Sequence, residues 1–363
     1  MSSGAWIVMR RPIRLLAVAS ALVLAGASIL TLVLFLSGAQ LVPAFTALWR
    51  GAFGSWDALL SGTLVRATPL ILTGLAVALA FRAGVWNIGA DGQLLAGAAA
   101  ATAVGLLPPM NDAAIAVPIA LLAAAAAGAI WALPAAWLKR RFGALEVIST
   151  IMLNFLAIHL VSYLVRGPLQ EPTRIYPQSP AIGHAARLPT FVDSRLHLGF
   201  GLAVLCVPVA AYLLRATAAG FRLKVVGAGP TAASVAGLVD VDRVRAHALL
   251  SSGALSGLAG GIEITGVTYA LYETLSPGYG YTAIAVALLA GLEPVLVLVA
   301  AIGLGALAAG GAAMQRDAGV PAGAAGTVEA VLVLLVLAAG ALAPQHRSLW
   351  RLVSGRKANI ESE

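Results

Sequence analysis

The sequence predicts an all-α polytopic membrane protein of about ten transmembrane helices, some of them broken or re-entrant. Of its 363 residues, 60% are hydrophobic and only 10% are charged, and the mean hydropathy is +0.93. A soluble domain has roughly 25% charged residues, so this chain carries too much apolar surface for a water-soluble core. Its 39 glycines fit the same class, because small residues let membrane helices approach closely.

The first half of the chain contains five expected spans. Basic residues precede the first apolar run, which is too long for a signal peptide and indicates an uncleaved span with a cytoplasmic N-terminus. The fourth span ends at Lys139, Arg140 and Arg141, a strong cytoplasmic signal. The expected spans cover residues 15–36, 58–80, 85–107, 113–138 and 145–165.

The second half contains five more segments, and one of them is unusual. Residues 281–290 are apolar but too short to cross as a regular helix, so they indicate a half-span or a re-entrant segment. The other four segments are expected at 198–214, 246–267, 295–313 and 327–342. Most Lys and Arg residues then fall on the cytoplasmic side, together with both termini.

The domain prediction is a single transmembrane domain over residues 1–363. The membrane core covers residues 15–342, and residues 343–363 form a cytoplasmic tail. Residues 215–245 form the longest internal polar stretch and are expected on the cytoplasmic side. Within it, Pro230 suits the first position of a helix of about two turns, Gly237 suits its end, and Asp240 or Asp242 can cap the next helix. This segment is either a solvated loop or a helix that a cytoplasmic partner protein binds and displaces.

The sequence carries no catalytic constellation. No HExxH, GxSxG or CxxC motif occurs, and none of the five histidines has a partner four residues away, so no metal site is expected. No lysine follows a GxxxxG frame, so the chain cannot hydrolyse ATP through a P-loop of its own. The basic residues lie between spans, which argues against nucleic-acid binding. The sequence therefore predicts a protein that is not an enzyme and binds no cofactor.

Polar residues inside expected spans are the candidates for a solute path. Such residues usually face a cavity or a partner, because burying them in lipid is costly. Asp91 and Gln93 could instead cap the third span, and Asn154 could join two helices. Glu146 is better explained as the start of a helix near Lys139–Arg141. The candidates are Asn87, Asp91, Gln93, Asn154 and Glu263.

Two stretches look like broken helices, at residues 82–93 and 277–294. Both combine Gly with Asn, Asp, Tyr or Pro, and irregular backbone in a membrane is tolerated only beside protein or water. Few charges accompany these breaks, so the expected solute is neutral and polar. A nearby group of tyrosines could contact sugar or base rings or form an interfacial belt. These are Tyr269, Tyr272, Tyr279 and Tyr281.

Four ordered motifs resemble the permease subunits of ABC importers for nucleosides and simple sugars, in the branched-chain amino acid/ribose-type permease superfamily. They run from about residue 67 to 333. GVWNIGADGQ is similar to the family's FNIGAEGQ signature, and EVISTIMLNF to its EVI-T-MLN stretch. The remaining two are VGAGPTAASVAGLVDVDRVR with the Gly-rich helix after it, and SPGYGYTAIAVALLAGLEP. The resemblance implies a type II importer fold and a permease role for nucleosides, with simple sugars such as ribose or galactose as the alternative.

The resemblance also implies partners. It suggests cytoplasmic ATPase subunits that use ATP and Mg²⁺, a second permease subunit that is a paralogue or an identical chain, and an extracytoplasmic solute-binding protein. The expected location is a bacterial plasma membrane. The cytoplasmic segment would then dock on the ATPase through Gly227, Pro230, Ala232, Ala233 and Gly237. A stand-alone secondary transporter is the competing hypothesis, and it predicts function without an ATPase.

Overall fold

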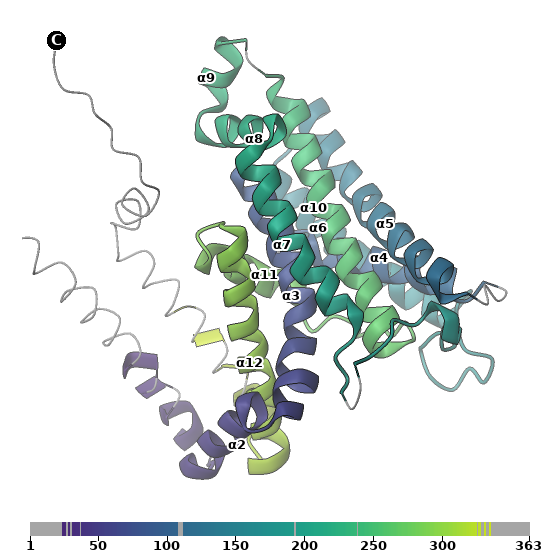
Figure 1. Cartoon of the computed structure of the whole chain (residues 1–363), viewed down its shortest axis with the longest axis vertical. Helices are drawn as coiled ribbons and strands as arrows, with labels where there is room; N and C mark the ends of the chain where they lie inside the picture. Colours follow the sequence, from purple (N-terminus) through teal and green to yellow (C-terminus); the bar gives the residue numbers. More distant parts are fainter. Residues whose placement is uncertain are drawn as a thin grey trace, which may run out of the picture. The chain divides into compact units, whose positions relative to one another are not determined.

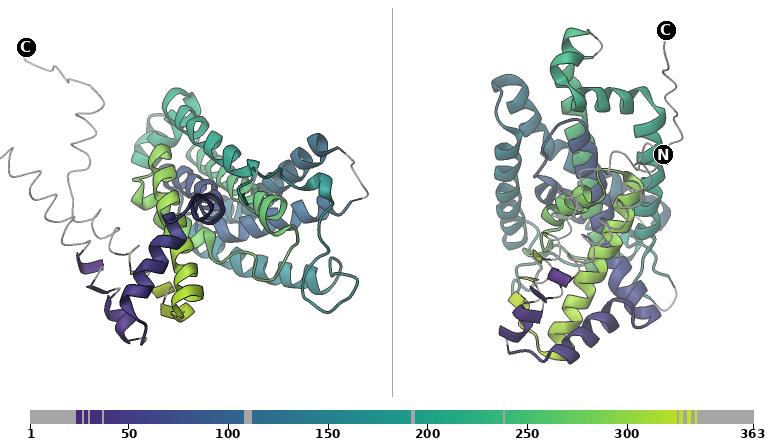
Figure 2. Two further views of the ribbon diagram at one scale, coloured as in Figure 1. Left: turned by 60° about the horizontal axis from the view of Figure 1, so that its bottom comes forward. Right: turned by 90° about the vertical axis from the view of Figure 1, so that its left-hand side faces the viewer.

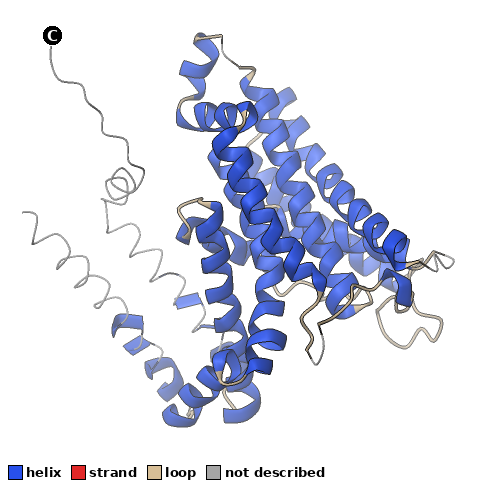
Figure 3. Cartoon of the chain, in the orientation of Figure 1, coloured by secondary structure: helices blue, strands red, loops and turns tan. Residues whose placement is uncertain are grey.

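The computed structural model describes residues 24–26, 28–29, 31–36, 38–107, 112–191, 194–237, 239–324, 326–327, 330–331 and 334. Their regular elements are helices (Figure 3), accompanied by two isolated β-bridges. The chain divides into two compact units. One unit is Thr46–Ala313, and the other combines Met1–Phe45 with Met314–Glu363. The predicted tail 343–363, most of the tenth span and the start of the first span lie outside the described residues.

The unit Thr46–Ala313 contains the elements that concern function. Its helices follow the predicted order, with boundaries that differ by a few residues. In chain order they are the end of α2 (Leu41–Phe53), η1 (Ala58–Leu64), α3 (Val65–Arg82), α4 (Ala90–Gly105), α5 (Ala113–Phe142), α6 (Glu146–Arg166), η2 (His184–Ala186), α7 (Leu198–Ala216), α8 (Ala218–Ala228), α9 (Pro230–Val235), α10 (Val241–Glu263), η3 (Ile264–Thr268), α11 (Tyr279–Leu289) and most of α12 (Pro294–Ala318).

The described residues contain 5 helices long and apolar enough to cross a membrane, or up to 6 if one bent pair counts as a broken span. This supports a multi-pass helical membrane protein. Two predicted crossings, α4 and α10, and the predicted half-span α11 fall outside that set. Helix α4 has 16 residues, and α11 has 11. An 11-residue helix rises about 17 Å, well short of the ~30 Å hydrocarbon core. Helix α10 is long enough, but it has Asp242, Arg243 and Arg245 at its start and is rich in glycine and serine after them.

Helix α10 packs directly against α4 and α5 through glycines (Figure 1). A Cβ atom added to Gly257 would lie 2.3 Å from the carbonyl oxygen of Ala124. One added to Gly260 would lie 2.0 Å from the carbonyl oxygen of Leu94. Only glycine leaves room for backbones this close, so the small residues of α10 bring three helices together as the composition predicted.

Residues 215–245 hold two helices where the sequence predicted one. Helix α9 begins at Pro230 as expected, and Gly237 has a φ of +63° beyond its end. The missed helix is α8, whose start is capped by Thr217, the side chain of which accepts from the Gly220 N–H at 3.2 Å. Figure 2 shows α8 lying across the ends of the long helices, with α9 beyond it. Asp240 caps α10, as predicted.

The loop between α6 and α7 is attached to the segment that follows α10. The Ser179 N–H donates to the Leu271 carbonyl at 2.9 Å, and the Ile182 N–H donates to the Tyr269 carbonyl at 2.8 Å. An ion pair joins Arg166 to Glu273 at 2.6 Å, and its hydrogen bonds lower the pKa of Glu273 to about 2. The segment after α10 is therefore held against the loop between α6 and α7 by backbone hydrogen bonds, and against α6 by the ion pair.

The glycine contact of α10 gives a stability prediction. Gly257→Val should destabilise the purified chain by about 1–3 kcal/mol, because the added carbons overlap the α5 backbone. Gly303→Val in α12 is the matched control, since a Cβ there meets no atom within 4 Å. Thermal unfolding in detergent measures both. Equal melting temperatures for the two variants would contradict this packing.

Candidate functional site

The first candidate site is the break between α3 and α4. Helix α3 ends at Arg82, Gly84 just beyond it has a φ of +72°, and α4 begins at Ala90. Asn87, fully buried between them, donates to Gln93 Oε1 at 2.9 Å and to Ser252 Oγ at 2.8 Å. Its own Oδ1 accepts from the Gly89 N–H at 2.9 Å and from Gln93 Nε2 at 3.2 Å. The two side-chain amides thus pair with each other across the break and hold it to α10.

Asn154 of α6 supports the other side of this break. Its Oδ1 accepts from the Gly92 N–H at 2.8 Å, and its Nδ2 donates to the Ile88 carbonyl at 2.8 Å. The same Nδ2 donates to Tyr281 Oη of α11 at 3.1 Å. Asn154 is fully buried and links three helices. This geometry matches the interhelical role that its depth in the membrane suggested.

Asp91 caps α11 and not α4, the helix that contains it. It is the second residue of α4, and no side chain caps that helix at its N-cap residue, Gly89. Its Oδ1 accepts from the Gly280 N–H of α11 at 3.0 Å and from Ser276 Oγ at 2.7 Å. The alternative interpretation, in which Asp91 and Gln93 cap the third span, does not hold. No residue with a side chain fits at position 280, since a Cβ added to Gly280 would lie 2.1 Å from the Asp91 nitrogen.

Glu263 lies apart from the other four residues. It is the last residue of α10, where that helix changes into the π-helical turn η3, and it is 6% exposed. Ser252, which joins the cluster at the break, is 11 residues earlier, or about 16 Å along the helix axis. Arg66 and Arg195 are within electrostatic reach of Glu263. The structure thus brings together Asn87, Asp91, Gln93 and Asn154, and it places Glu263 nearer the other end of α10.

Several hydroxyl side chains complete the cluster without having been singled out from the sequence. Thr150 Oγ1 accepts from the Ile88 N–H at 3.3 Å, and Ser252 and Ser276 contact Asn87 and Asp91. Serine and threonine are common in membrane helices, so their presence alone gave no signal. Thr150 lies four residues before Asn154 on the same face of α6, and that spacing was the one available clue.

The predicted tyrosine group comes from two parts of the chain. Tyr279 and Tyr281 belong to α11, and Tyr281 contacts Asn154 at the break. Tyr269 lies after η3, where the guanidinium of Arg187 stacks 4.7 Å from the centroid of its ring.

The second candidate site is the segment 215–245, which was expected on the cytoplasmic side. Gly227 packs against the end of α3, because an added Cβ would lie 2.0 Å from the Arg82 carbonyl oxygen. In α9, Ala232 is exposed whereas Ala233 is only 2% exposed. The Val235 side chain is 84% exposed and was not among the predicted contact residues. Thr231, Ala232, Ser234 and Val235 of α9 are exposed, Val235 is its large apolar exposed side chain, and Ala233 is the residue of α9 that is buried against the rest of the chain.

Glu146 occupies the place predicted for it. It is the first residue of α6, and its carboxylate lies 2.7 Å from the Lys139 Nζ. In the described residues no group of three or more His, Cys, Asp or Glu side chains could hold a metal ion. Cys206, within α7, is a free cysteine.

Comparison with known proteins gives consistent matches. Residues 59–339 match the family model for the permease component of branched-chain amino acid transport systems. The guanosine ABC transporter permease protein NupP of Bacillus subtilis is 38% identical over 316 residues, covering 86% of this chain and 90% of that protein. The glucose ABC transporter permease protein TsgB13 of Haloferax volcanii is 37% identical, covering 77% and 76%.

A third relative has a similar name. The nucleoside ABC transporter permease protein NupB of Lactococcus lactis is 28% identical over 76% of this chain and 78% of its own length. No solved structure matches this chain significantly. The family model covers well over half of the residues, in the region where the breaks and the cytoplasmic segment lie. The chain therefore belongs to the family of branched-chain amino acid transport system permease components, which are transport proteins and not enzymes.

Proposed function

We propose that this chain is the membrane-spanning permease subunit of an ATP-driven importer for nucleosides. The observation that carries the proposal is its 38% identity to a guanosine permease over 86% of the chain. The absence of a P-loop in the sequence fits a subunit whose ATP is hydrolysed by partners. Simple sugars are the second candidate, because a glucose permease is 37% identical over a comparable length.

The proposed assembly has four kinds of component. Cytoplasmic ATPase subunits use ATP and Mg²⁺, this chain binds no cofactor, and a solute-binding protein delivers the solute from outside. A second permease subunit completes the path. We favour a paralogue, because Bacillus subtilis has two guanosine permease proteins, NupP and NupQ, that are both similar to this chain. The assembly sits in a bacterial plasma membrane.

The proposed topology has about ten crossings, with both termini in the cytoplasm. It treats α4 and α10 as crossings. It treats α11 as a half-span that begins at the break, beside Asp91, and leads to Glu293. Basic residues support this orientation, since Lys139 to Arg141 and the charges of α8 all lie on the proposed cytoplasmic side. Residues 1–363 then form one permease domain.

We further propose that the break borders the solute path. Asn87, Asp91, Gln93 and Asn154 shape it by fixing the irregular backbone, and Glu263 lies towards its external end. Their side chains are at most 6% exposed, so they act on the path through the backbone they hold. Irregular backbone of this kind in a membrane is tolerated only beside protein or water, which favours a path here.

The transport proposal predicts ATP-dependent uptake of guanosine. Proteoliposomes holding both permeases and the ATPase, with the binding protein added, should accumulate labelled guanosine only when ATP is present. Unlabelled glucose in excess should not compete. Competition by glucose but not by nucleosides would move the assignment to sugars, and uptake that follows a proton gradient without the ATPase would overturn the proposal.

The coupling proposal predicts an effect at the outward face of α9. Val235→Asp should reduce copurification of the ATPase with the permease roughly tenfold, because it places a charge on an exposed apolar side chain in the proposed contact. Ile175→Asp, which alters a 71% exposed side chain in the loop between α6 and α7, is the matched control. If both variants retain the ATPase equally, α9 is not the docking helix.

The path proposal predicts that Asn87 and Gln93 act as one unit. Asn87→Ala should lower uptake and thermal stability, since the Gln93 amide and Ser252 lose buried partners. The Asn87→Ala/Gln93→Ala double variant should cost little more than either single variant, because they share one interaction. Uptake rate and apparent solute affinity measure the result. Unchanged values in the double variant would remove both residues from the path.

A further inference from the structure

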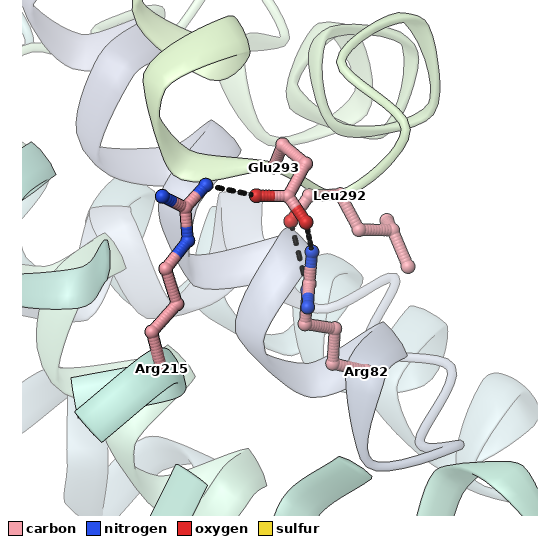
Figure 4. A network of polar contacts seen from close by, with 4 residues as sticks. All are labelled: Arg82, Arg215, Leu292 and Glu293. Atoms are coloured by element: carbon pink, nitrogen blue, oxygen red, sulfur yellow. Dashed lines mark hydrogen bonds and ion pairs between the residues drawn. The ribbon is translucent and has the colours of Figure 1, made fainter. Parts of the chain in front are cut away.

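One carboxylate connects three helices at the cytoplasmic end of the unit Thr46–Ala313. Glu293 lies in the turn between α11 and α12 and forms ion pairs with Arg82, the last residue of α3, and with Arg215, near the end of α7 (Figure 4). The Arg215 Nη2 lies 2.9 Å from Glu293 Oε2. Arg82 also donates from Nε to the Leu292 carbonyl at 2.9 Å, so it binds both a side chain and the backbone of the turn.

The two ion pairs are unequal. The side chains of Arg82 and Glu293 are 16% and 18% exposed, whereas that of Arg215 is 51% exposed. Burial acts to raise the pKa of Glu293, but hydrogen bonds from Arg215 and Arg82 hold this pKa below its usual value, so the carboxylate is charged. An exposed ion pair contributes little to stability. A mostly buried ion pair with an additional hydrogen bond to the backbone fixes the relative orientation of its two residues. Arg82 is therefore the main partner of Glu293.

Arg82 also touches the proposed coupling segment. Gly227 at the end of α8 packs onto the Arg82 carbonyl so closely that a Cβ would lie 2.0 Å away. Lys224 of α8 interacts electrostatically with all three charged residues of the cluster. Arg215 stands two residues before Thr217, which caps α8. A displacement of α8 thus acts on the cluster through the backbone of Arg82 and through the end of α7.

Helix α11 carries the connection from this cluster to the break. Its cytoplasmic end leads into Leu292 and Glu293, and its other end is capped by Asp91 through the Gly280 N–H. Its 11 residues span about 17 Å. A short packed helix of this length transmits a shift of one end to the other, because packed interiors have low compressibility. One end of α11 is therefore fixed to the end of α3, and the other end is fixed to the start of α4.

We propose that Glu293 is a positioning residue for coupled transport, which passes a displacement of α8 and α9 along α11 to the break at Asn87–Asp91. This role rests on the proposed importer function. Arg82 and Arg215 hold the two oxygens of the carboxylate, and Lys224 of α8 is a third cation that interacts with it electrostatically. A movement of α8 therefore changes the charges that act on Glu293, and with them the position of the turn between α11 and α12.

A stabilising role alone explains the cluster poorly. Half-buried ion pairs lose much of their Coulomb energy to desolvation, and apolar residues of similar size are often as stable. A charged cluster at the meeting point of three helix ends instead fixes their relative positions. The distinction is measurable, because loss of stability lowers uptake and ATP hydrolysis together, whereas loss of coupling lowers uptake per ATP.

The test uses the complete importer in proteoliposomes, with guanosine uptake and ATP hydrolysis measured in the same sample. Glu293→Gln should lower the ratio of guanosine moved to ATP hydrolysed roughly tenfold, within the 5–150-fold range typical of coupling between sites. Arg82→Gln should do the same, and the Arg82→Gln/Glu293→Gln double variant should be no worse than either single variant. Arg215→Gln should have a smaller effect, because Arg215 is half exposed.

Glu273→Gln is the matched control. It removes a carboxylate that is also held by an arginine, Arg166, but in the segment after α10 and outside this cluster. Its ratio should equal that of the unaltered importer. A normal ratio in Glu293→Gln, or an equal loss in Glu273→Gln, overturns the role of Glu293 alone. A lack of ATP-dependent uptake by the unaltered importer overturns the proposed function and this role with it.

Discussion

Inside a membrane, a broken helix leaves backbone N–H and C=O groups that water does not solvate, and each needs a partner from the protein. The break between α3 and α4 meets this requirement with side chains from other helices. Asn154 of α6 accepts from Gly92 and donates to Ile88, and Thr150 accepts from Ile88. Asn87 satisfies Gly89 and ties the break to α10. The positions of α4, α6 and α10 all depend on these bonds.

The same requirement explains the half-span α11. A helix that starts inside a membrane exposes free N–H groups at its first turn, and Asp91 accepts one of them from Gly280. The carboxylate near the start of α11 is also favourable for the helix dipole. The α3–α4 break and the start of α11 thus support each other. Glycines at the contacts, such as Gly280 and Gly92, give the backbones room to meet. A carrier that must open a path can use such joints, because they are polar and rely on few side chains.

Local signals in the sequence were enough for much of the fold. Pro230 and Gly237 marked α9, Asp240 marked the start of α10, and Glu146 began α6. The shortness of residues 281–290 predicted a segment unable to cross. Helix α8 was missed, although Thr217 stands at its start, because the glycines and charges around it resemble a loop. The sequence grouped Asn87, Asp91, Gln93, Asn154 and Glu263 as unusual polar residues in apolar spans, and the first four of them lie together at the break.

What these residues contact could not be read from the sequence. Asp91 and Gly280 are 189 positions apart, and Arg82 and Glu293 are 211 apart. No local pattern encodes such pairs, so the sequence offered a cap of its own helix as the alternative role for Asp91 and gave no sign of Gly280. Likewise, periodicity does not show which face of a six-residue helix is outward, and Val235 was overlooked in favour of the buried Ala233.

The central claim is that the α3–α4 break is a fixed structure held by side-chain hydrogen bonds. Amide hydrogen exchange of the resting importer tests it most directly, because it reports the opening of individual backbone bonds. The account predicts that the Gly89 and Gly92 amides, bonded to Asn87 and Asn154, exchange slowly, as helix interiors do. Exchange at these two amides as fast as in the exposed loop between α6 and α7 would contradict it.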